Sequence, residues 1–221
     1  MPATLAASIL SADMARLLDQ VRLVERYADS LHIDLMDGHF VSTLGIGPGV
    51  VESLRPHTDL RFHCHLMLED PLALLDVLAK AGTNLVTCHL EAVEDDPAAA
   101  IAEVRARGMD AGLAINPETP AAVLLPYLEQ VVGVIVMSVH PGWAGQAFLP
   151  EVLPKVEALR AEIDRRGLTV DIEMDGGINA ETGRRCLEAG ATVLAAASSI
   201  FRSEDPAASA RTLADLVRSV P

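Results

Sequence analysis

Histidines and carboxylates recur two residues apart in three short apolar runs of this chain. They are His32 and Asp34 in the run 31–36, His63 and His65 in the run 60–67, and Asp171, Glu173 and Asp175 in the run 170–175. On a strand, residues two apart face the same side. Imidazole nitrogens and carboxylate oxygens are ligands of divalent metals, and carboxylates also act as general bases. The pattern therefore indicates a buried site for a cation, for proton transfer, or for both.

The runs that carry these residues belong to a longer alternation. Eight short apolar runs occupy residues 4–10, 31–36, 60–67, 85–90, 111–116, 133–139, 170–175 and 192–198, and helical patterns between them include 12–28, 71–82, 151–167 and 179–190. Several helical patterns open with Pro, Asp or Asn and end in Gly, as helix boundaries do. Strands alternating with helices predict a parallel sheet. Eight such units in 221 residues predict an α/β fold, a (β/α)₈ TIM barrel that fills residues 1–221 as a single domain, rather than an open doubly wound sheet.

The barrel prediction places the polar residues together. Ser8, Asp34, His65 and Asp175 fall at or near the C-terminal ends of their strands, where such barrels build active sites. Buried carboxylates need compensation, and a divalent cation supplies it. Two imidazoles and two carboxylates would leave coordination positions open for substrate or water. The alternative is that each polar residue is a hydrogen-bonded core group. This alternative is less favoured because four such residues are in phase at the same ends of their strands.

The other histidines are less decisive. His57 is expected in a surface loop and His63 deeper in the barrel, whereas His39 and His89 fit pocket lining and local hydrogen bonding equally well.

Three segments after the last three runs suit an anion. They are residues 140–148, 174–179 and 196–201. Glycines let backbone N–H groups approach an oxyanion, and barrels often bind phosphate after strands seven and eight. Gly176, Gly177, Ala197 and Ser198 are expected there, and 142–145 could close as a lid with Trp143 excluding water. Alternatively, the glycines only make tight turns.

Composition narrows the function classes. The net charge of −14 argues against nucleic acid and anionic membranes as partners. No apolar run reaches the ~18 residues of a membrane span, and the N-terminus resembles no secretory signal, so a cytoplasmic protein is expected. Three cysteines form no disulfide framework, and Cys64 and Cys88 are expected to be buried.

Lysine usage excludes one mechanism. The two lysines, Lys80 and Lys155, both lie in helical patterns, whereas Schiff-base barrel enzymes need a lysine that projects from a strand. The Asp-x-Lys-x-x-Asp signature of orotidine-phosphate decarboxylase is also absent. After Asp34, Met36 stands where the signature has its lysine, and His39 stands where it has its second aspartate.

Five motifs in order and spacing resemble the ribulose-phosphate 3-epimerase family. They are "SILSAD" (8–13), "LHIDLMDGHF" (31–40), "CHLM" (64–67), "MSVHPGWAGQAF" (137–148) and "EMDGGIN" (173–179), and the similarity runs from about Leu5 to Phe201.

The resemblance implies one divalent metal ion (Zn, Fe, Mn or Co, which the sequence does not distinguish). Its implied ligands are His32, Asp34, His65 and Asp175, with Asp34 and Asp175 as the acid/base pair and Met36, Met67 and Met137 near the metal. The implied substrate-binding residues are Ser8, His65, Gly142, Trp143, Ala144, Gly145, Gln146, Asp175, Gly176, Gly177, Ala197 and Ser198.

The implied activity is a metal-dependent isomerase of carbohydrate metabolism, in the pentose phosphate pathway. It would interconvert D-ribulose 5-phosphate and D-xylulose 5-phosphate by two-base proton transfer at C3, through a metal-stabilised cis-enediolate. The partner is a phosphorylated ketose, and the sequence leaves homo-oligomerisation open.

Departures from the family pattern leave an alternative substrate. Ser42-Thr43, His140 and Ala197 replace common family residues near the substrate, so a 3-epimerase of another ketose phosphate, such as D-allulose 6-phosphate, is the second reading. A non-catalytic metal or phosphate sensor is less favoured because a sensor needs no paired bases. A barrel lyase or decarboxylase is weakened by the missing strand lysine.

Overall fold

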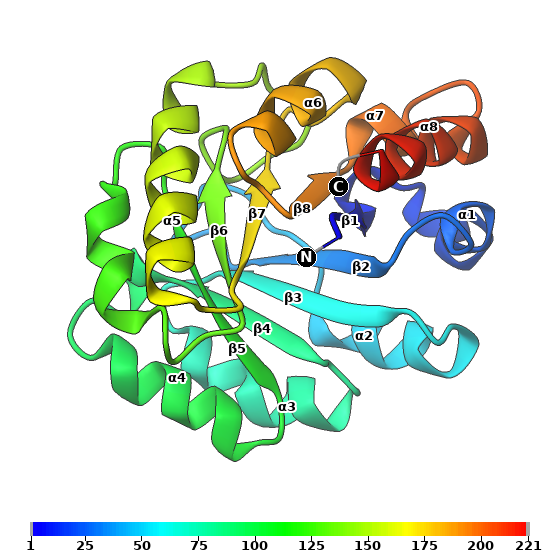
Figure 1. The fold of residues 1–221 in the computed structure, drawn as a ribbon. Coiled ribbons are helices and arrows are strands. Elements are labelled where there is room, and N and C mark those ends of the chain that lie inside the picture. Colours follow the sequence, from blue (N-terminus) through cyan, green and yellow to red (C-terminus); the bar gives the residue numbers. More distant parts are fainter. Residues whose placement is uncertain (1, 220–221) are drawn as a thin grey trace.

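Eight parallel strands close into one barrel in the computed structural model, which describes residues 2–219 (Figure 1). They are β1 (Thr4–Ser8), β2 (Ser30–Met36), β3 (Arg61–Met67), β4 (Leu85–His89), β5 (Asp110–Ile115), β6 (Gly133–Met137), β7 (Asp171–Asp175) and β8 (Val193–Ala196). Each strand pairs with its sequence neighbours, and β8 pairs with β1. The predicted (β/α)₈ fold is confirmed.

Helices lie around the barrel, either between successive strands or after the last strand (Figure 1). They are α1 (Leu17–Val24), α2 (Pro48–Leu54), α3 (Leu75–Lys80), α4 (Pro97–Ala106), α5 (Leu153–Arg166), α6 (Ala180–Glu188), α7 (Ser198–Phe201) and α8 (Pro206–Arg218). The β5–β6 connection is instead the 3₁₀ segment η6 (Ala121–Tyr127), which contains Pro126. Shorter 3₁₀ turns are η1 (Ile9–Ser11), η2 (Met14–Arg16), η3 (Arg55–His57), η4 (Pro71–Leu74), η5 (Leu90–Ala92) and η7 (Pro150–Val152).

An Asp-Pro dipeptide starts three of these segments. The side chains of Asp70, Asp96 and Asp205 each accept a hydrogen bond from the backbone N–H three residues on. Proline fits the next position because its missing N–H would have no partner in the helix, and its fixed φ suits the first turn.

Strand β2 shows how the barrel separates its two faces. Leu31, Ile33 and Leu35 are buried in the large apolar cluster that joins strands and helices. His32 and Asp34 alternate with them, and both interact with side chains of other strands inside the barrel. The β2–β3 register pairs His32 with His63 and Asp34 with His65. Polar side chains are therefore stacked in layers along the barrel interior.

Apolar residues lie beside the polar side chains on β1 and β8, where Ala195 is the register partner of both Asp175 and Ala6. Ala6, Val193 and Ala195 form a buried cluster separate from the helix-facing core. At Gly112 a Cβ atom would lie 2.4 Å from the Thr87 hydroxyl, so a side chain there would collide with an inward polar group.

Two glycines pack the loop after β7 against the loop after β6. Gly176 and Gly177 have φ angles of 114° and 65°, and a Cβ on Gly176 would lie 2.4 Å from Val139. The Ser138 hydroxyl donates to the Gly176 carbonyl at 2.7 Å. These contacts require glycine for backbone reasons, apart from any role in anion binding.

The remaining sequence expectations concern cysteines and membranes. Cys64, Cys88 and Cys186 are free, as their spacing predicts, and burial confirms the prediction made for Cys64 and Cys88 and extends to Cys186. Burial raises the pKa of the Cys64 thiol to about 11. Within residues 2–219, every helix is too short or too polar to cross a bilayer.

We expect Leu35→Ala to lower the free energy of unfolding by about 2–5 kcal/mol, because it leaves a cavity between the barrel and its helices. Chemical denaturation measures this change. Leu44→Ala is the matched control, since Leu44 is 81% exposed and its truncation should change stability by less than about 0.5 kcal/mol. Equal effects of the two substitutions would contradict the core assignment.

Candidate active site

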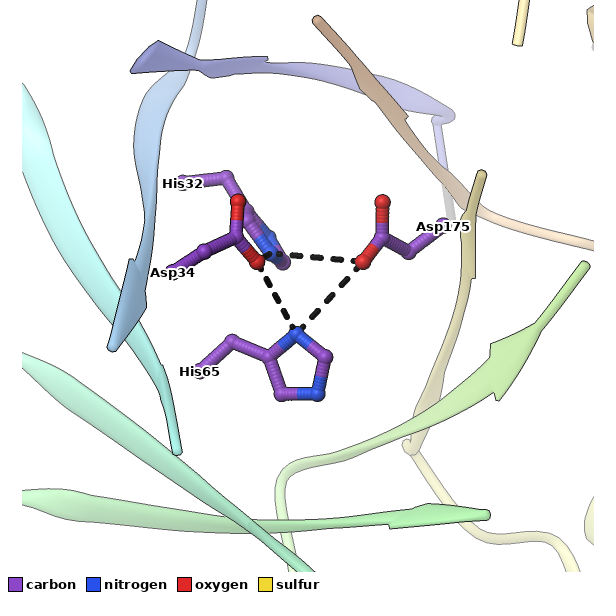
Figure 2. Close-up of side chains that lie close together, drawn as sticks. All are labelled: His32, Asp34, His65 and Asp175. Carbon is purple, nitrogen blue, oxygen red and sulfur yellow. Dashed lines mark hydrogen bonds and ion pairs between the residues drawn. The ribbon is translucent and has the colours of Figure 1, made fainter. Parts of the chain in front are cut away.

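Four side chains from three strands converge inside the C-terminal end of the barrel (Figure 2). One potential ligand atom from each of His32, Asp34, His65 and Asp175 lies within 4.8 Å of the other three. His32 Nε2 is 3.1 Å from Asp34 Oδ1 and 3.6 Å from Asp175 Oδ2. His65 Nδ1 is 3.2 Å and 3.4 Å from the same two oxygens. Each aspartate therefore faces both histidines.

This donor set fits a divalent cation. Ligand atoms that each lie ~2.1 Å from one ion are about 3.0–3.4 Å apart, and the four contacts above span 3.1–3.6 Å. The two imidazoles are fully buried and Asp34 is 2% exposed. Two nitrogen and two oxygen donors suit zinc, iron, manganese and cobalt alike.

Without a cation, the cluster holds protons. Burial alone would lower the pKa of His32, but Asp34, Glu173 and Asp175 outweigh it and raise that pKa well above its ordinary value. The pKa of His65 is also raised, because hydrogen bonds to Asp175 and Asp34 outweigh burial. Burial would raise the pKa of Asp34, yet His32 and His65 hold it far below its usual range.

A second buried carboxylate lies beneath the cluster. Glu173 Oε1 is 2.6 Å from His32 Nδ1, and Glu173 Oε2 is 3.0 Å from His63 Nδ1. His63 Nε2 in turn lies 2.7 Å from the Thr87 hydroxyl. Despite its burial, the pKa of Glu173 is well below its usual range because of His63 and His32. His63 is therefore deeper than the cluster and outside it.

A fourth carboxylate, that of Glu91, is linked to the cluster from the side. His65 Nε2 is 2.9 Å from His89 Nε2, and His89 Nδ1 is 3.2 Å from Glu91. Glu91 also accepts from the backbone N–H of Asn116 at 2.8 Å and from the Thr119 hydroxyl. Burial lowers the pKa of His89 to about 4. Burial opposes ionisation of Glu91, but its hydrogen bonds hold its pKa at about 2.

A pocket of ≈ 480 Å³, counted to its open mouth, lies above the four side chains. Of the predicted substrate-binding residues, all except His65 line it. His65 is instead fully buried within the cluster. Met36, Met67 and Met137 also line the pocket, together with Leu10, Val139, Pro141, Ile178 and Ala195, which sequence analysis did not predict.

The loop over this pocket is held by its own side chains. Gln146 Nε2 donates to the carbonyl oxygens of His140 at 2.6 Å and Trp143 at 2.9 Å. The Thr43 hydroxyl donates to the Gly142 carbonyl, so one of the unusual residues after β2 contacts the loop after β6. Trp143 is 55% exposed at the rim.

The remaining candidates lie away from the four side chains. His39 and His57 are exposed, and His39 bonds locally to the backbone of Asp37. Lys80 and Lys155 are on helices α3 and α5. The sequence pattern did not identify Glu173 or Glu91 as partners of the cluster, although Glu173 is in phase with Asp175. Of the two roles expected for His89, hydrogen bonding is observed and pocket lining is not.

The fold and site define a (β/α)₈-barrel enzyme with a buried histidine–aspartate centre below a glycine-rich rim. The sequence pattern of the ribulose-phosphate 3 epimerase family matches residues 4–201, and the chain belongs to that family.

Individual comparisons agree with this assignment. Ribulose-phosphate 3-epimerase of Mycobacterium tuberculosis (strain H37Rv) is 45% identical over 209 residues, which cover 95% of this chain and 90% of the relative. The Bacillus subtilis protein of the same name is 41% identical over 202 residues, covering 90% and 93%. A 3-hexulose-6-phosphate synthase structure matches with a TM-score of 0.73 and 21% identity, covering 96% of this chain and 99% of the other; that likeness shows the fold alone. The chain is thus an isomerase of the epimerase class, as predicted.

We expect Zn²⁺ binding to weaken as the pH falls. The raised pKa of His32 keeps it protonated at a higher pH than an ordinary imidazole of pKa ~6.5, and a ligand nitrogen must first lose that proton. Calorimetry in buffers of different ionisation enthalpy should detect proton release on binding near neutral pH. Binding without proton release there, or tighter binding at acidic pH, would contradict these electrostatics.

Proposed function

We propose that this enzyme interconverts D-ribulose 5-phosphate and D-xylulose 5-phosphate by two-base proton transfer at C3. The observation that carries the proposal is the placement of Asp34 and Asp175. They come from β2 and β7, which are separated by β1 and β8 in the barrel, and both line the pocket floor while facing the same two histidines. Family membership and the names of the relatives support the same reaction.

His32, Asp34, His65 and Asp175 would hold one divalent cation. When bound, the cation supplies positive charge that stabilises negative charge developing on the sugar oxygens during deprotonation. The buried position of the ligands strengthens that interaction, because little water screens it.

The two aspartates would exchange the proton. One carboxylate removes the C3 proton from one face of the sugar, and the other returns a proton to the opposite face, which inverts the stereocentre. The Ser8 hydroxyl donates to Asp34 Oδ2 at 2.8 Å, while Oδ1 faces the histidines. The low pKa of Asp34 means that this base is ionised and ready at neutral pH.

Backbone groups on the rim would bind the phosphate. Gly176, Gly177, Ala197 and Ser198 line one part of the pocket, and residues 142–146 line another. Neither lysine is among the lining residues, so N–H groups are the donors we expect. The net charge of −14 does not oppose this local arrangement.

Methionines would form the apolar walls around the reacting carbon. Met36, Met67 and Met137 line the pocket beside the aspartates. Their thioethers are polarizable and carry no acidic proton, so they would not compete with the aspartates for the proton of the sugar.

We expect Asp34→Asn and Asp175→Asn each to lower kcat by at least ~10²–10⁴-fold, because each removes an acid/base group and also weakens a cation site. Ser203→Ala is a control, since within residues 2–219 the Ser203 hydroxyl donates to the Ile200 carbonyl and to no side chain of the site. Steady-state kinetics with saturating metal measures the effect. Near-normal turnover in either aspartate variant would show that the site is misassigned.

Incubation with ribulose 5-phosphate in D₂O should incorporate deuterium at C3, since the proton passes through an exchangeable carboxyl group. Mass spectrometry and NMR of the recovered sugar measure it. Epimerisation without any solvent deuterium would contradict the two-base mechanism.

The pentulose phosphate should be a better substrate than D-allulose 6-phosphate. The second sugar is tested because Thr43 contacts the rim loop and Ala197 lines the pocket. Comparable or higher kcat/KM for the hexulose phosphate would favour the alternative substrate.

A cytoplasmic location stays a prediction that fractionation can test.

A further inference from the structure

The two histidines of the cluster face it through different ring nitrogens. His32 directs Nε2 towards the aspartates, whereas His65 directs Nδ1. In each case the other nitrogen of the ring has a buried partner. For His32 that partner is Glu173, and for His65 it is His89, which continues to Glu91.

We propose that Glu173 and the His89–Glu91 pair are positioning residues that fix opposite tautomers of the two histidines, so that each presents a lone pair to the same cation. This inference rests on the metal site of the proposed function. It assigns roles to residues that lie outside the four-ligand set.

The first arm, which consists of Glu173 and His63, lies below the cluster. Its hydrogen-bond donors and acceptors can be assigned one after another. An ionised carboxylate only accepts hydrogen bonds, so the 2.6 Å contact with Glu173 places a proton on His32 Nδ1. In the neutral, ligating form of His32 this is the ring's single proton, so Nε2 keeps its lone pair. The second Glu173 oxygen accepts from His63 Nδ1 at 3.0 Å, and His63 Nε2 can then accept from the Thr87 hydroxyl. In this arm each hydrogen-bond donor therefore faces an acceptor.

The second, lateral arm consists of His89 and Glu91. Its carboxylate reaches the ligating histidine through one additional imidazole, that of His89. Glu91 is held by the Asn116 N–H and the Thr119 hydroxyl, and it accepts from His89 Nδ1. His89 Nε2 is then an acceptor, and its only partner among the hydrogen bonds above is His65 Nε2 at 2.9 Å. His65 must therefore donate from Nε2, so in the neutral, ligating form of this ring the Nδ1 lone pair faces Asp34 and Asp175.

Lys155 stiffens the loop that holds Glu91. Its ammonium donates to the backbone carbonyl oxygens of Pro117 and, at 2.6 Å, Thr119. The loop after β5 is thus tied to helix α5, and Glu91 has a fixed set of donors. Both arms end in a carboxylate that the fold holds in place.

Outer partners of this kind affect metal affinity. A carboxylate that accepts from a ligating imidazole orients the ring and makes its free nitrogen a stronger donor, and loss of such a partner typically weakens metal binding ~10–100-fold. A purely structural role for Glu173 predicts no such specific effect.

The test measures Zn²⁺ affinity of the whole protein by competition with a chromogenic chelator. We expect Glu173→Gln and, independently, His89→Phe to weaken binding by ~10–100-fold. Asp171→Asn is the matched control, because Asp171 is on the same strand and its carboxylate accepts from Thr192 rather than from a histidine. Circular dichroism and thermal melting of the metal-free variants verify that they are folded.

Nitrogen-15 NMR of the Zn²⁺-loaded wild-type protein supplies the second readout. His32 should carry its proton on Nδ1 and His65 on Nε2. The same tautomer at both residues, or Zn²⁺ affinities of both folded variants equal to that of Asp171→Asn, would overturn this inference alone. Failure of the wild-type protein to bind Zn²⁺, Mn²⁺, Fe²⁺ or Co²⁺ would instead overturn the metal site of the proposed function, and this inference with it.

Discussion

His32 lies between two buried carboxylates, 2.6 Å from Glu173 and 3.1 Å from Asp34, and the barrel interior is arranged around that imidazole. An isolated carboxylate in this environment would be protonated, because burial penalises its charged form. Neighbouring imidazoles offset that penalty, because His32 and His65 lower the pKa of Asp34, and His63 and His32 lower the pKa of Glu173. The site therefore contains ionised carboxylates whose negative charge a bound cation would compensate.

Closure of the barrel brings Asp175 to the residues of β2 and β3. Asp34 and His65 are register partners on neighbouring strands, so local pairing brings them together. Asp175 reaches them only because β8 pairs with β1 and completes the ring. Small inward residues such as Ala6 and Ala195 leave the interior space that four polar side chains need.

Strand periodicity explains how much of this arrangement could be predicted. Alternation alone predicted that His32 and Asp34 share the inner face, and the barrel rule predicted that Asp34, His65 and Asp175 meet at its C-terminal end. The same alternation placed Glu173 inward, but periodicity cannot separate a ligand from its partner. Glu91 lies beyond its strand in η5, so its contact depends on loop geometry. The 3₁₀ segment η6 escaped prediction because Pro126 interrupts a regular helix.

In the proposed reaction, Asp34 and Asp175 flank opposite faces of one carbon of a phosphorylated ketose. A crystal structure of the metal-loaded Asp175→Asn variant with D-ribulose 5-phosphate tests it most directly. We expect C3 of the sugar to lie between residues 34 and 175, with a side-chain oxygen of each within ~3.5 Å on opposite faces. Both side chains on one face of the sugar, or C3 distant from both, would contradict it.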